Sequence, residues 1–229
     1  MRRALAIAAA ITAIAVCAAA QAPVTRPDIK RTRGRTVPDV TLLSEDSTAF
    51  RFSAMAGKPI IVSPIFTSCP HTCSLITASL RDALAEIGEP EVGYHVLTVS
   101  FDPADGPAQL RAYREKLQLP AGWRLAVASP DDLAQLLDAI DFRYEALDEG
   151  GFAHPNGISI IDPELKVAAY INGVSYDAAE VRRELESAVR GTSLVHKARP
   201  LLLAISLLGL LTVVAVLFIT GRKARPQGA

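Results

Sequence analysis

Two cysteines and one distant histidine are the residues best suited to chemistry. Cys69 and Cys73 lie in the stretch TSCPHTC, directly after the apolar run Ile60–Phe66, and His154 lies far downstream in GGFAHPNG. The third of the chain's 3 cysteines, Cys17, falls in an N-terminal segment typical of a cleaved export signal. A thiol pair in an exported protein forms a disulfide, a redox couple or a soft-metal site.

The spacing of the cysteines brings their sulfurs together if a helix begins near Pro70. Residues four apart lie on one face of a helix, one turn apart, and proline suits the first helical turn, where its missing N–H is not needed. The positive end of the helix dipole favours thiolate over thiol. Thiolates are both Cu(I) ligands and nucleophiles, so the spacing is compatible with a metal site and with a redox site.

His154 is a candidate third ligand, from a loop that the neighbouring glycines allow to move. Two thiolates and one imidazole form a soft, low-coordinate set that suits copper and is one ligand short of a closed structural zinc site. Asp102 ends a predicted strand beside the site and is a candidate for orienting a ligand by a hydrogen bond. The Asp-Pro pair in which it lies is also ordinary turn chemistry.

Plainer interpretations exist for the same residues. Cys69 and Cys73 are compatible with a structural disulfide, although closing so short a loop stabilises little. An isolated loop histidine such as His154 is usually a surface residue. A peroxidase using Cys69 fits less well, because neither the second cysteine nor the late histidine has a place in it.

Between about Val37 and about Arg190 the hydrophobic pattern predicts one domain. Its predicted elements are, in order, a hairpin of Val37–Leu43 and Phe50–Phe52, strand Ile60–Phe66, helix Ser74–Ile87, strand Tyr94–Phe101, helix Pro107–Leu117, strand Arg124–Ala128, helix Asp131–Ile140, a hairpin of Ile158–Ile161 and Val167–Ile171, and helix Asp177–Val189. This alternation predicts an α/β sandwich around a mixed sheet. The cysteines then follow the carboxyl end of a central strand, where such sheets bind ligands.

The N-terminus predicts an export signal over residues 1–20. Arg2 and Arg3 precede the apolar run Ala4–Val16, and small residues at 18–20 place cleavage before Gln21. An uncleaved anchor is the alternative. Residues 21–36 are rich in arginine and lysine and predict a basic, flexible linker, more simply solvated than bound to anionic lipid.

Residues 200–220 predict a transmembrane helix. Leu201–Thr220 contains no charged residue and has about the ~20 residues that span a bilayer. Basic residues flank both ends, so the export signal decides the topology: the domain lies in the periplasm, anchored to a bacterial inner membrane, and the tail 221–229 stays in the cytoplasm. The net charge is +0, and the domain shows no basic patch interleaved with aromatic residues, which argues against nucleic-acid binding.

Three segments, in this order, resemble the Sco/SenC family of copper-binding, thioredoxin-like assembly factors. FTSCPHTC at residues 66–73 is similar to the family's strand followed by a CPxxC motif. SFDPADGP at residues 100–107 is similar to its Ser-x-Asp-Pro segment with a second Asp and a Pro after it. His154, followed by Ile158–Asp162, is similar to its late histidine and a strand closing on Asp-Pro. The resemblance covers roughly Val37 to Val189.

The resemblance implies a thioredoxin fold with copper held by Cys69, Cys73 and His154. It also implies a role in delivering copper to, or reducing, the binuclear copper centre of a haem–copper cytochrome oxidase, from a membrane-tethered position. This chain departs from the family's pattern at the tether, because its convincing anchor is C-terminal. That departure raises the possibility of a divergent subgroup with another client.

Two functional hypotheses remain open. The first is a copper chaperone that passes copper to an oxidase subunit by ligand exchange. The second is a thiol–disulfide oxidoreductase in which Cys69 attacks a client disulfide and Cys73 resolves the mixed disulfide. The two are not exclusive, because a chaperone needs a thiol reductant to keep its cysteines able to bind Cu(I).

Overall fold

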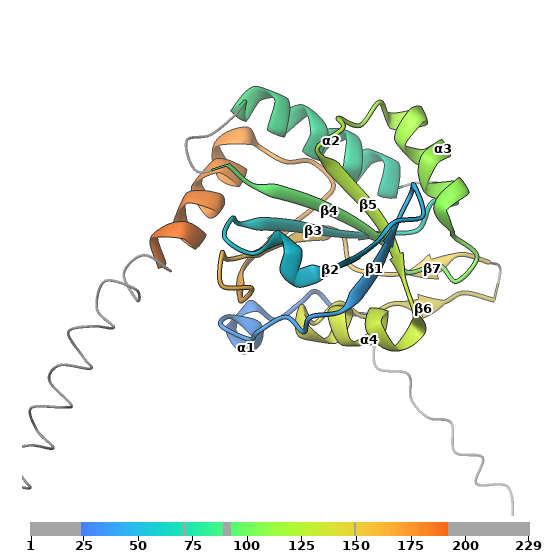
Figure 1. Ribbon diagram of the computed structural model, residues 1–229, viewed down its shortest axis with the longest axis horizontal. Coiled ribbons are helices and arrows are strands. Elements are labelled where there is room, and N and C mark those ends of the chain that lie inside the picture. Colours follow the sequence, from blue (N-terminus) through green and yellow to red (C-terminus); the bar gives the residue numbers. More distant parts are fainter. Residues whose placement is uncertain (1–23, 71, 89–92, 149, 192–229) are drawn as a thin grey trace, which may run out of the picture.

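The computed structural model describes residues 24–70, 72–88, 93–148 and 150–191 (Figure 1). The predicted export signal (1–20), transmembrane helix (200–220) and tail (221–229) lie outside the described residues, and so does His71. None of the helices within the described ranges has both the length and the apolar character needed to cross a bilayer.

A mixed sheet of seven strands forms the middle of the domain (Figure 1). Its strands are, in spatial order, β2 (Ala49–Arg51), β1 (Thr41–Ser44), β5 (Trp123–Ala128), β4 (His95–Ser100), β3 (Ile60–Ile65), β8 (Gly157–Ile161) and β9 (Val167–Asn172). The three central strands β3, β4 and β5 are parallel, and the outer strands pair antiparallel. Because the central strands are parallel, their carboxyl ends meet at one edge of the sheet.

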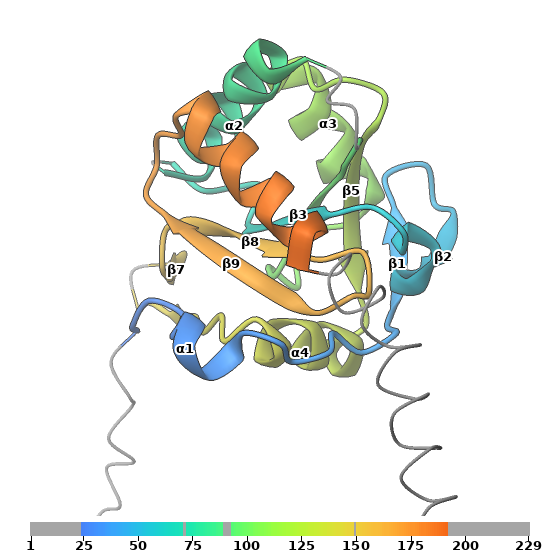
Figure 2. The ribbon, with the colours of Figure 1, turned by 90° about the vertical axis from the view of Figure 1, so that its left-hand side faces the viewer.

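Helices cover both faces of the sheet. α2 (Thr72–Ile87), α3 (Pro107–Leu117) and a helix over residues 178–191 lie on one side, and α1 (Ile29–Thr32) and α4 (Pro130–Ala139) lie on the other (Figures 1 and 2). Proline opens both α3 and α4, as its fixed φ and missing N–H favour.

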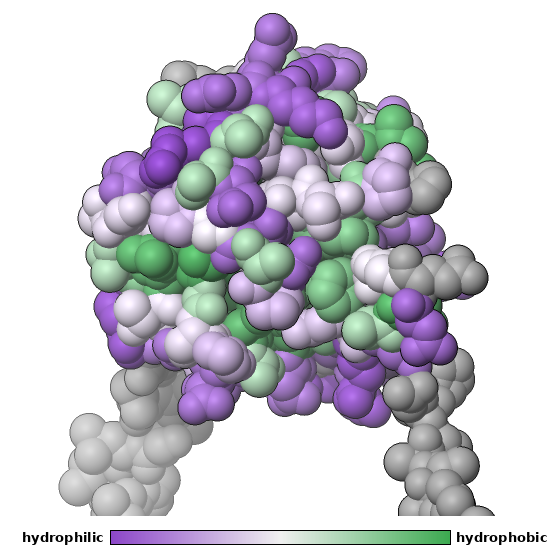
Figure 3. All heavy atoms as spheres, turned by 90° about the vertical axis from the view of Figure 1, so that its right-hand side faces the viewer, coloured by the Kyte–Doolittle hydropathy of each residue, from purple (hydrophilic) through white to green (hydrophobic). Residues whose placement is uncertain are grey.

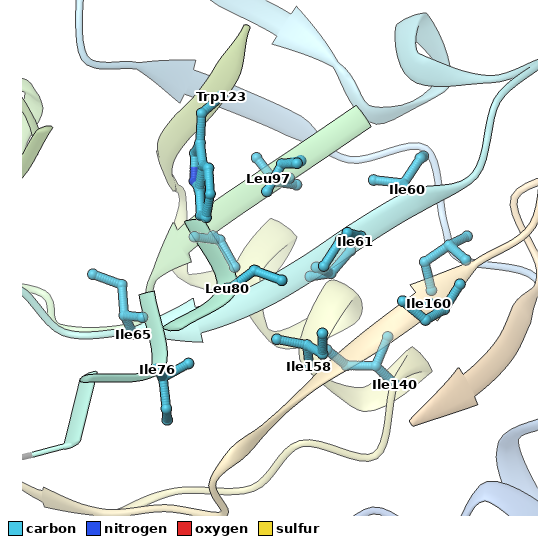
Figure 4. Close-up of a cluster of buried hydrophobic side chains, with 14 of the residues drawn as sticks. Ile60, Ile61, Ile65, Ile76, Leu80, Leu97, Trp123, Ile140, Ile158 and Ile160 are labelled. Atoms are coloured by element: carbon cyan, nitrogen blue, oxygen red, sulfur yellow. The ribbon is translucent and has the colours of Figure 1, made fainter. Parts of the chain in front are cut away.

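The core lies on both sides of β3, every residue of which is buried. A strand covered on two faces must be apolar throughout rather than alternating, which the sequence IIVSPI largely satisfies. Figure 4 shows the packing: Ile76 and Leu80 of α2 approach from one side, and Ile140, just after α4, lies beside Ile158 of β8. This packing fixes the end of β3, where the cysteine turn begins.

The predicted α/β fold with a mixed central sheet is confirmed. α3 has the predicted bounds, and the remaining predicted strands and helices agree at their centres. The first strand begins at Thr41 rather than Val37, and α2 begins at Thr72, two residues before the predicted start. The sequence did not predict α1, a single 3-10 turn at Phe52–Met55, or the two short strands β6 (Glu145–Ala146) and β7 (Phe152–Ala153).

The described part of the predicted basic linker packs against the domain. Arg31 pairs with Asp141 at 2.6 Å, and Arg35 pairs with Asp138 at 2.7 Å. Thr32 is buried, and Thr36 forms a β-bridge with Lys166. Composition alone predicted a solvated linker because the acidic partners lie more than 100 residues away.

Candidate metal centre

Cys69, Cys73 and His154 converge at the carboxyl end of β3. Their ligand atoms all lie within 4.8 Å of one another, and Cys73 Sγ lies 3.7 Å from His154 Nε2. In residues 24–191, apart from the undescribed positions, this is the one cluster of three or more His, Cys, Asp or Glu side chains that could hold a metal ion. The three residues singled out by sequence are therefore the three that the fold brings together.

The cysteines are presented by a turn and the first turn of α2. The turn closes where the Cys69 amide donates to the Phe66 carbonyl at 3.2 Å. Cys69 thus precedes α2, while Cys73 lies inside it. The Cys73 amide nitrogen lies 3.5 Å from Cys69 Sγ, so the first sulfur points at the start of the helix, and no disulfide joins the two.

The two sulfurs differ in exposure. Cys69 is 8% exposed and Cys73 is 0% exposed. Burial raises the pKa of the Cys73 thiol strongly, because the thiolate loses its water, and the neighbouring Cys69 raises it further. The pKa of Cys73 is thus raised rather than lowered, contrary to the expectation from its place at the helix N-terminus, and desolvation is the largest cause. A metal ion binding there displaces a proton.

The tautomer of His154 is set by the backbone. His154 Nδ1 lies 3.0 Å from the Pro155 carbonyl oxygen, so Nδ1–H donates to it, and the lone pair of Nε2 is left facing Cys73. Burial lowers the pKa of His154, because the imidazolium loses hydration. A neutral imidazole with Nε2 unprotonated is the form that ligates a metal.

Aromatic rings surround the imidazole of His154. The ring centroids of Phe66, Phe101 and Phe142 lie 5.8, 5.4 and 6.0 Å from its own. Phe152 of β7 packs edge-on against both Phe66 and Phe101. The imidazole is thus wedged into an apolar cluster and is not the surface residue of the plainer interpretation.

The loop that carries His154 is held on its far side by close backbone packing. Gly157 starts β8 with φ +154, and a Cβ at this position would lie 2.5 Å from the Ile171 carbonyl oxygen. Tyr170 Oη donates to the Asn156 carbonyl at 2.7 Å. Gly157 therefore permits close packing of β8 on β9 rather than the loop motion that the sequence suggested.

Two aspartates lie beside the cysteine turn, and the structure gives them different contacts. Asp102 accepts from the Ala104 amide at 2.8 Å and lies 3.4 Å from Ser68 Oγ. Asp105 accepts from both the amide and the hydroxyl of Thr67, at 2.8 and 2.5 Å. The sequence singled out Asp102 and passed over Asp105, although both belong to SFDPADGP. The only local signal for Asp105 was its place in that segment.

The donor set fits a soft metal ion. A metal bound to sulfur at about 2.3 Å and to imidazole at about 2.0 Å, as in zinc sites, requires ligand atoms roughly 3.5 Å apart. The Cys73 Sγ to His154 Nε2 distance of 3.7 Å is close to that spacing. Two sulfurs and one imidazole favour copper over harder cations, which prefer oxygen ligands.

The surface around the centre is mixed in character. Figure 3 views the molecule from the side of β6 and β7, where apolar and weakly polar residues gather across the middle and hydrophilic ones above and below. A groove of about 840 Å³ runs beside the centre, lined by residues that include Phe101, Asp102, Phe142 and Tyr144. Tyr144 and Leu147, which flank β6, are among the exposed large apolar residues.

A thioredoxin-like α/β domain with two cysteines and a histidine converging at the end of a central strand defines a class of thiol and metal-binding proteins. The sequence matches the SCO1/SenC family over residues 30–190, and the chain belongs to that family. The predicted family membership is confirmed.

Solved structures agree with this assignment. One of them is a protein from Aquifex aeolicus VF5 described as an electron transfer protein. It is 37% identical, with a TM-score of 0.65 over 68% of this chain and 94% of that one. Arabidopsis thaliana ScoI, solved with copper bound, is 18% identical, with a TM-score of 0.60 over 68% of this chain and 99% of that one. BsSco is described as a Sco-family cytochrome c oxidase assembly protein with a disulfide switch. It is 19% identical, with a TM-score of 0.60 over 72% of this chain and 96% of that one.

Proposed function

We propose that this protein is a copper chaperone that holds copper through Cys69 Sγ, Cys73 Sγ and His154 Nε2. The observation that carries the proposal is the convergence of these three ligand atoms within 4.8 Å. Copper bound in the similar structure of Arabidopsis thaliana ScoI supports it. The naming of BsSco as a cytochrome c oxidase assembly protein supports an oxidase subunit, at its binuclear copper centre, as the acceptor.

The three ligand residues have different roles in binding and releasing copper. The Cys73 thiol is buried, and the half-buried His154 imidazole is fixed by its contact with the Pro155 carbonyl, so both are prearranged to hold the ion. The proton of Cys73 leaves as copper enters. Cys69 is the more exposed of the two sulfurs. Of the two cysteines, an acceptor ligand therefore displaces Cys69 first, and copper passes on by stepwise ligand exchange. Three ligands leave room for that incoming ligand.

The proposal places the domain outside the cytoplasm on a C-terminal anchor. Its support is the sequence alone: an export signal over residues 1–20 and an uncharged apolar segment over residues 200–220. In this arrangement the domain works in the periplasm at the surface of the inner membrane.

A thiol–disulfide oxidoreductase is the second candidate, favoured by the contact of the Cys73 amide with Cys69 Sγ. The Cys69 thiolate would attack a client disulfide, forming a mixed disulfide and releasing one client thiolate. The Cys73 thiolate would then attack Cys69 Sγ, releasing the second client thiol. The pair ends oxidised, so an external thiol reductant must restore it. His154 has no part in this cycle.

The deciding experiment is an anaerobic Cu(I) titration of the purified, reduced full-length protein against a chromogenic Cu(I) chelator. We expect one copper per chain, lost in Cys69→Ala and Cys73→Ala and weakened at least about tenfold in His154→Ala. His95→Ala is the matched control, because His95 lies at the start of β4, at the opposite end of that strand from the centre. Undiminished affinity in either cysteine variant would sink the chaperone, and indifference to His154 would favour the oxidoreductase.

A further inference from the structure

Asp105 ties the cysteine turn to the end of β4. Its Oδ2 accepts from the Thr67 amide at 2.8 Å and from the Ser100 hydroxyl at 2.5 Å, and its Oδ1 accepts from the Thr67 hydroxyl at 2.5 Å. Ser100 is the last residue of β4 and is 2% exposed, so one end of the connection is anchored in the sheet. The other end is anchored two residues before Cys69.

The cysteine turn is held by the burial of Cys69, by its contact with the Cys73 amide and by the bonds to Asp105. Ser68 and Pro70, the neighbours of Cys69, are both exposed, so packing does not fix the backbone on either side of the sulfur. Within the turn one backbone hydrogen bond closes Cys69 onto Phe66. Because both hydrogen-bond donors of Thr67 are engaged by Asp105, the turn cannot rotate without breaking two bonds to a carboxylate.

We propose that Asp105 is the residue that positions Cys69 for the copper centre. The proposal rests on the function proposed above and adds the group that keeps the more exposed of its two cysteines in place. Asp105 bonds to Thr67 and Ser100, so it acts on Cys69 through Thr67 and the turn. Asp102, which the sequence favoured for this role, reaches the turn through a single contact of 3.4 Å to Ser68.

A carboxylate suits this role better than an amide. Three donors converge on the two oxygens of Asp105, and the amide of an asparagine has one oxygen and an NH₂ group that cannot accept. Asp105→Asn keeps the shape and leaves at least one donor without its acceptor. Thr67→Val removes only the hydroxyl donor at nearly constant shape, and Thr67→Ser retains it.

Cu(I) affinity and the reactivity of the copper-free thiols test the proposal together. We expect Asp105→Asn to weaken Cu(I) binding about tenfold, because a hydrogen bond to a charged group is lost. We expect Thr67→Val to weaken it by about threefold and Thr67→Ser and Asp102→Asn to stay near wild type. In the copper-free protein, reaction of Cys69 with a chromogenic disulfide should quicken severalfold in Asp105→Asn, since the turn no longer holds the sulfur against α2.

These readouts separate the possible failures. A purely structural role would lower the melting temperature of Asp105→Asn and leave both the affinity and the thiol reactivity of the folded protein unchanged, which would overturn the proposal. If Asp105→Asn does not fold, equal copper affinities in Thr67→Val and Thr67→Ser would overturn it instead. If the wild type fails to bind Cu(I), the chaperone fails, and the thiol reactivities still decide whether Asp105 positions Cys69.

Discussion

The cysteine turn and the His154 loop meet at one site but are held by different forces. The turn is fixed by hydrogen bonds to one carboxylate and by the start of a helix. The imidazole is fixed by the packing of phenylalanine rings and by one backbone carbonyl. Polar bonds depend on exact partners, whereas apolar packing tolerates change of shape but responds to lost volume. The two sides of the centre should therefore fail in different ways.

The largest effect should come from removing a sulfur. Cys73→Ser replaces a buried soft ligand by a hydroxyl, and we expect Cu(I) affinity to fall about 100- to 1,000-fold. This follows from structural metal sites, where about 10–16 kcal/mol is shared among four ligands. The anaerobic chelator titration measures it. Ser74→Ala is the matched control on the neighbouring residue, and a fall in that variant as large as in Cys73→Ser would contradict the assignment of the sulfur as ligand.

Loss of volume on the histidine side comes next. Phe152→Ala removes a half-buried ring that packs against Phe66 and Phe101, and we expect the free energy of unfolding to fall by about 2 kcal/mol. Copper affinity should fall with it, because His154 is less confined. Chemical denaturation measures the first effect. Leu147→Ala, at a side chain 49% exposed on the same hairpin, should change stability by no more than about 0.5 kcal/mol.

Acid should destabilise the copper-free protein through its two half-buried histidines, His154 and His95. Burial lowers the pKa of both His154 and His95 below 6.5, so the unfolded chain binds more protons just below that pH, and stability falls as the pH drops. Each histidine changes the free energy of unfolding by well below about 1.4 kcal/mol per pH unit, the most that one titrating group can give. Asp162, whose pKa burial raises above 3.8, acts in the opposite sense at lower pH.

Denaturation of the copper-free protein between pH 7.5 and 5.5 measures this acid sensitivity. We expect His154→Gln and His95→Gln each to flatten part of the slope. Stability that rises on acidification through this range would contradict the burial of both imidazoles.

The smallest effect should come from a bond behind the cysteines. Tyr113 Oη donates to the Cys73 carbonyl at 3.0 Å and lies 2.8 Å from Thr77 Oγ1. Tyr113→Phe should lower the free energy of unfolding by about 1 kcal/mol and change Cu(I) affinity by less than about threefold. Thermal denaturation and the copper titration together measure this. A large loss of affinity would mean that the helix, rather than the turn held by Asp105, limits the cysteine side.

The sequence predicted the cysteine side better than the histidine side. Apolar runs and prolines predict β3, α3 and α4, because these signals depend only on neighbouring residues. The two cysteines are four residues apart, so one helix that begins near them is enough to bring their sulfurs together. β6 and β7 are two residues each and carry no periodic signal. Their position depends on the rings of Phe66 and Phe101, which follow β3 and β4 and lie far from Phe152 in the chain, so no local pattern reveals it.

The sequence also did not predict the roles of the acidic residues, because their partners lie far away in the chain. Asp105 binds Thr67 across 38 positions, and Asp141 binds Arg31 across 110. The composition indicated a basic segment at residues 21–36. Only the fold shows which acidic residue each of its arginines binds. The sequence likewise did not predict the desolvation of Cys73. A helix start, and with it the helix dipole, can be predicted from the sequence, but the burial of a single side chain cannot.

X-ray absorption at the copper edge tests the central claim most directly, since that claim is that both sides of the centre bind one ion. For the full-length protein loaded with one Cu(I), the account predicts two sulfur ligands and one nitrogen ligand, with the nitrogen signal absent in His154→Ala and retained in His95→Ala. A two-sulfur site that is the same in wild type and His154→Ala would contradict it.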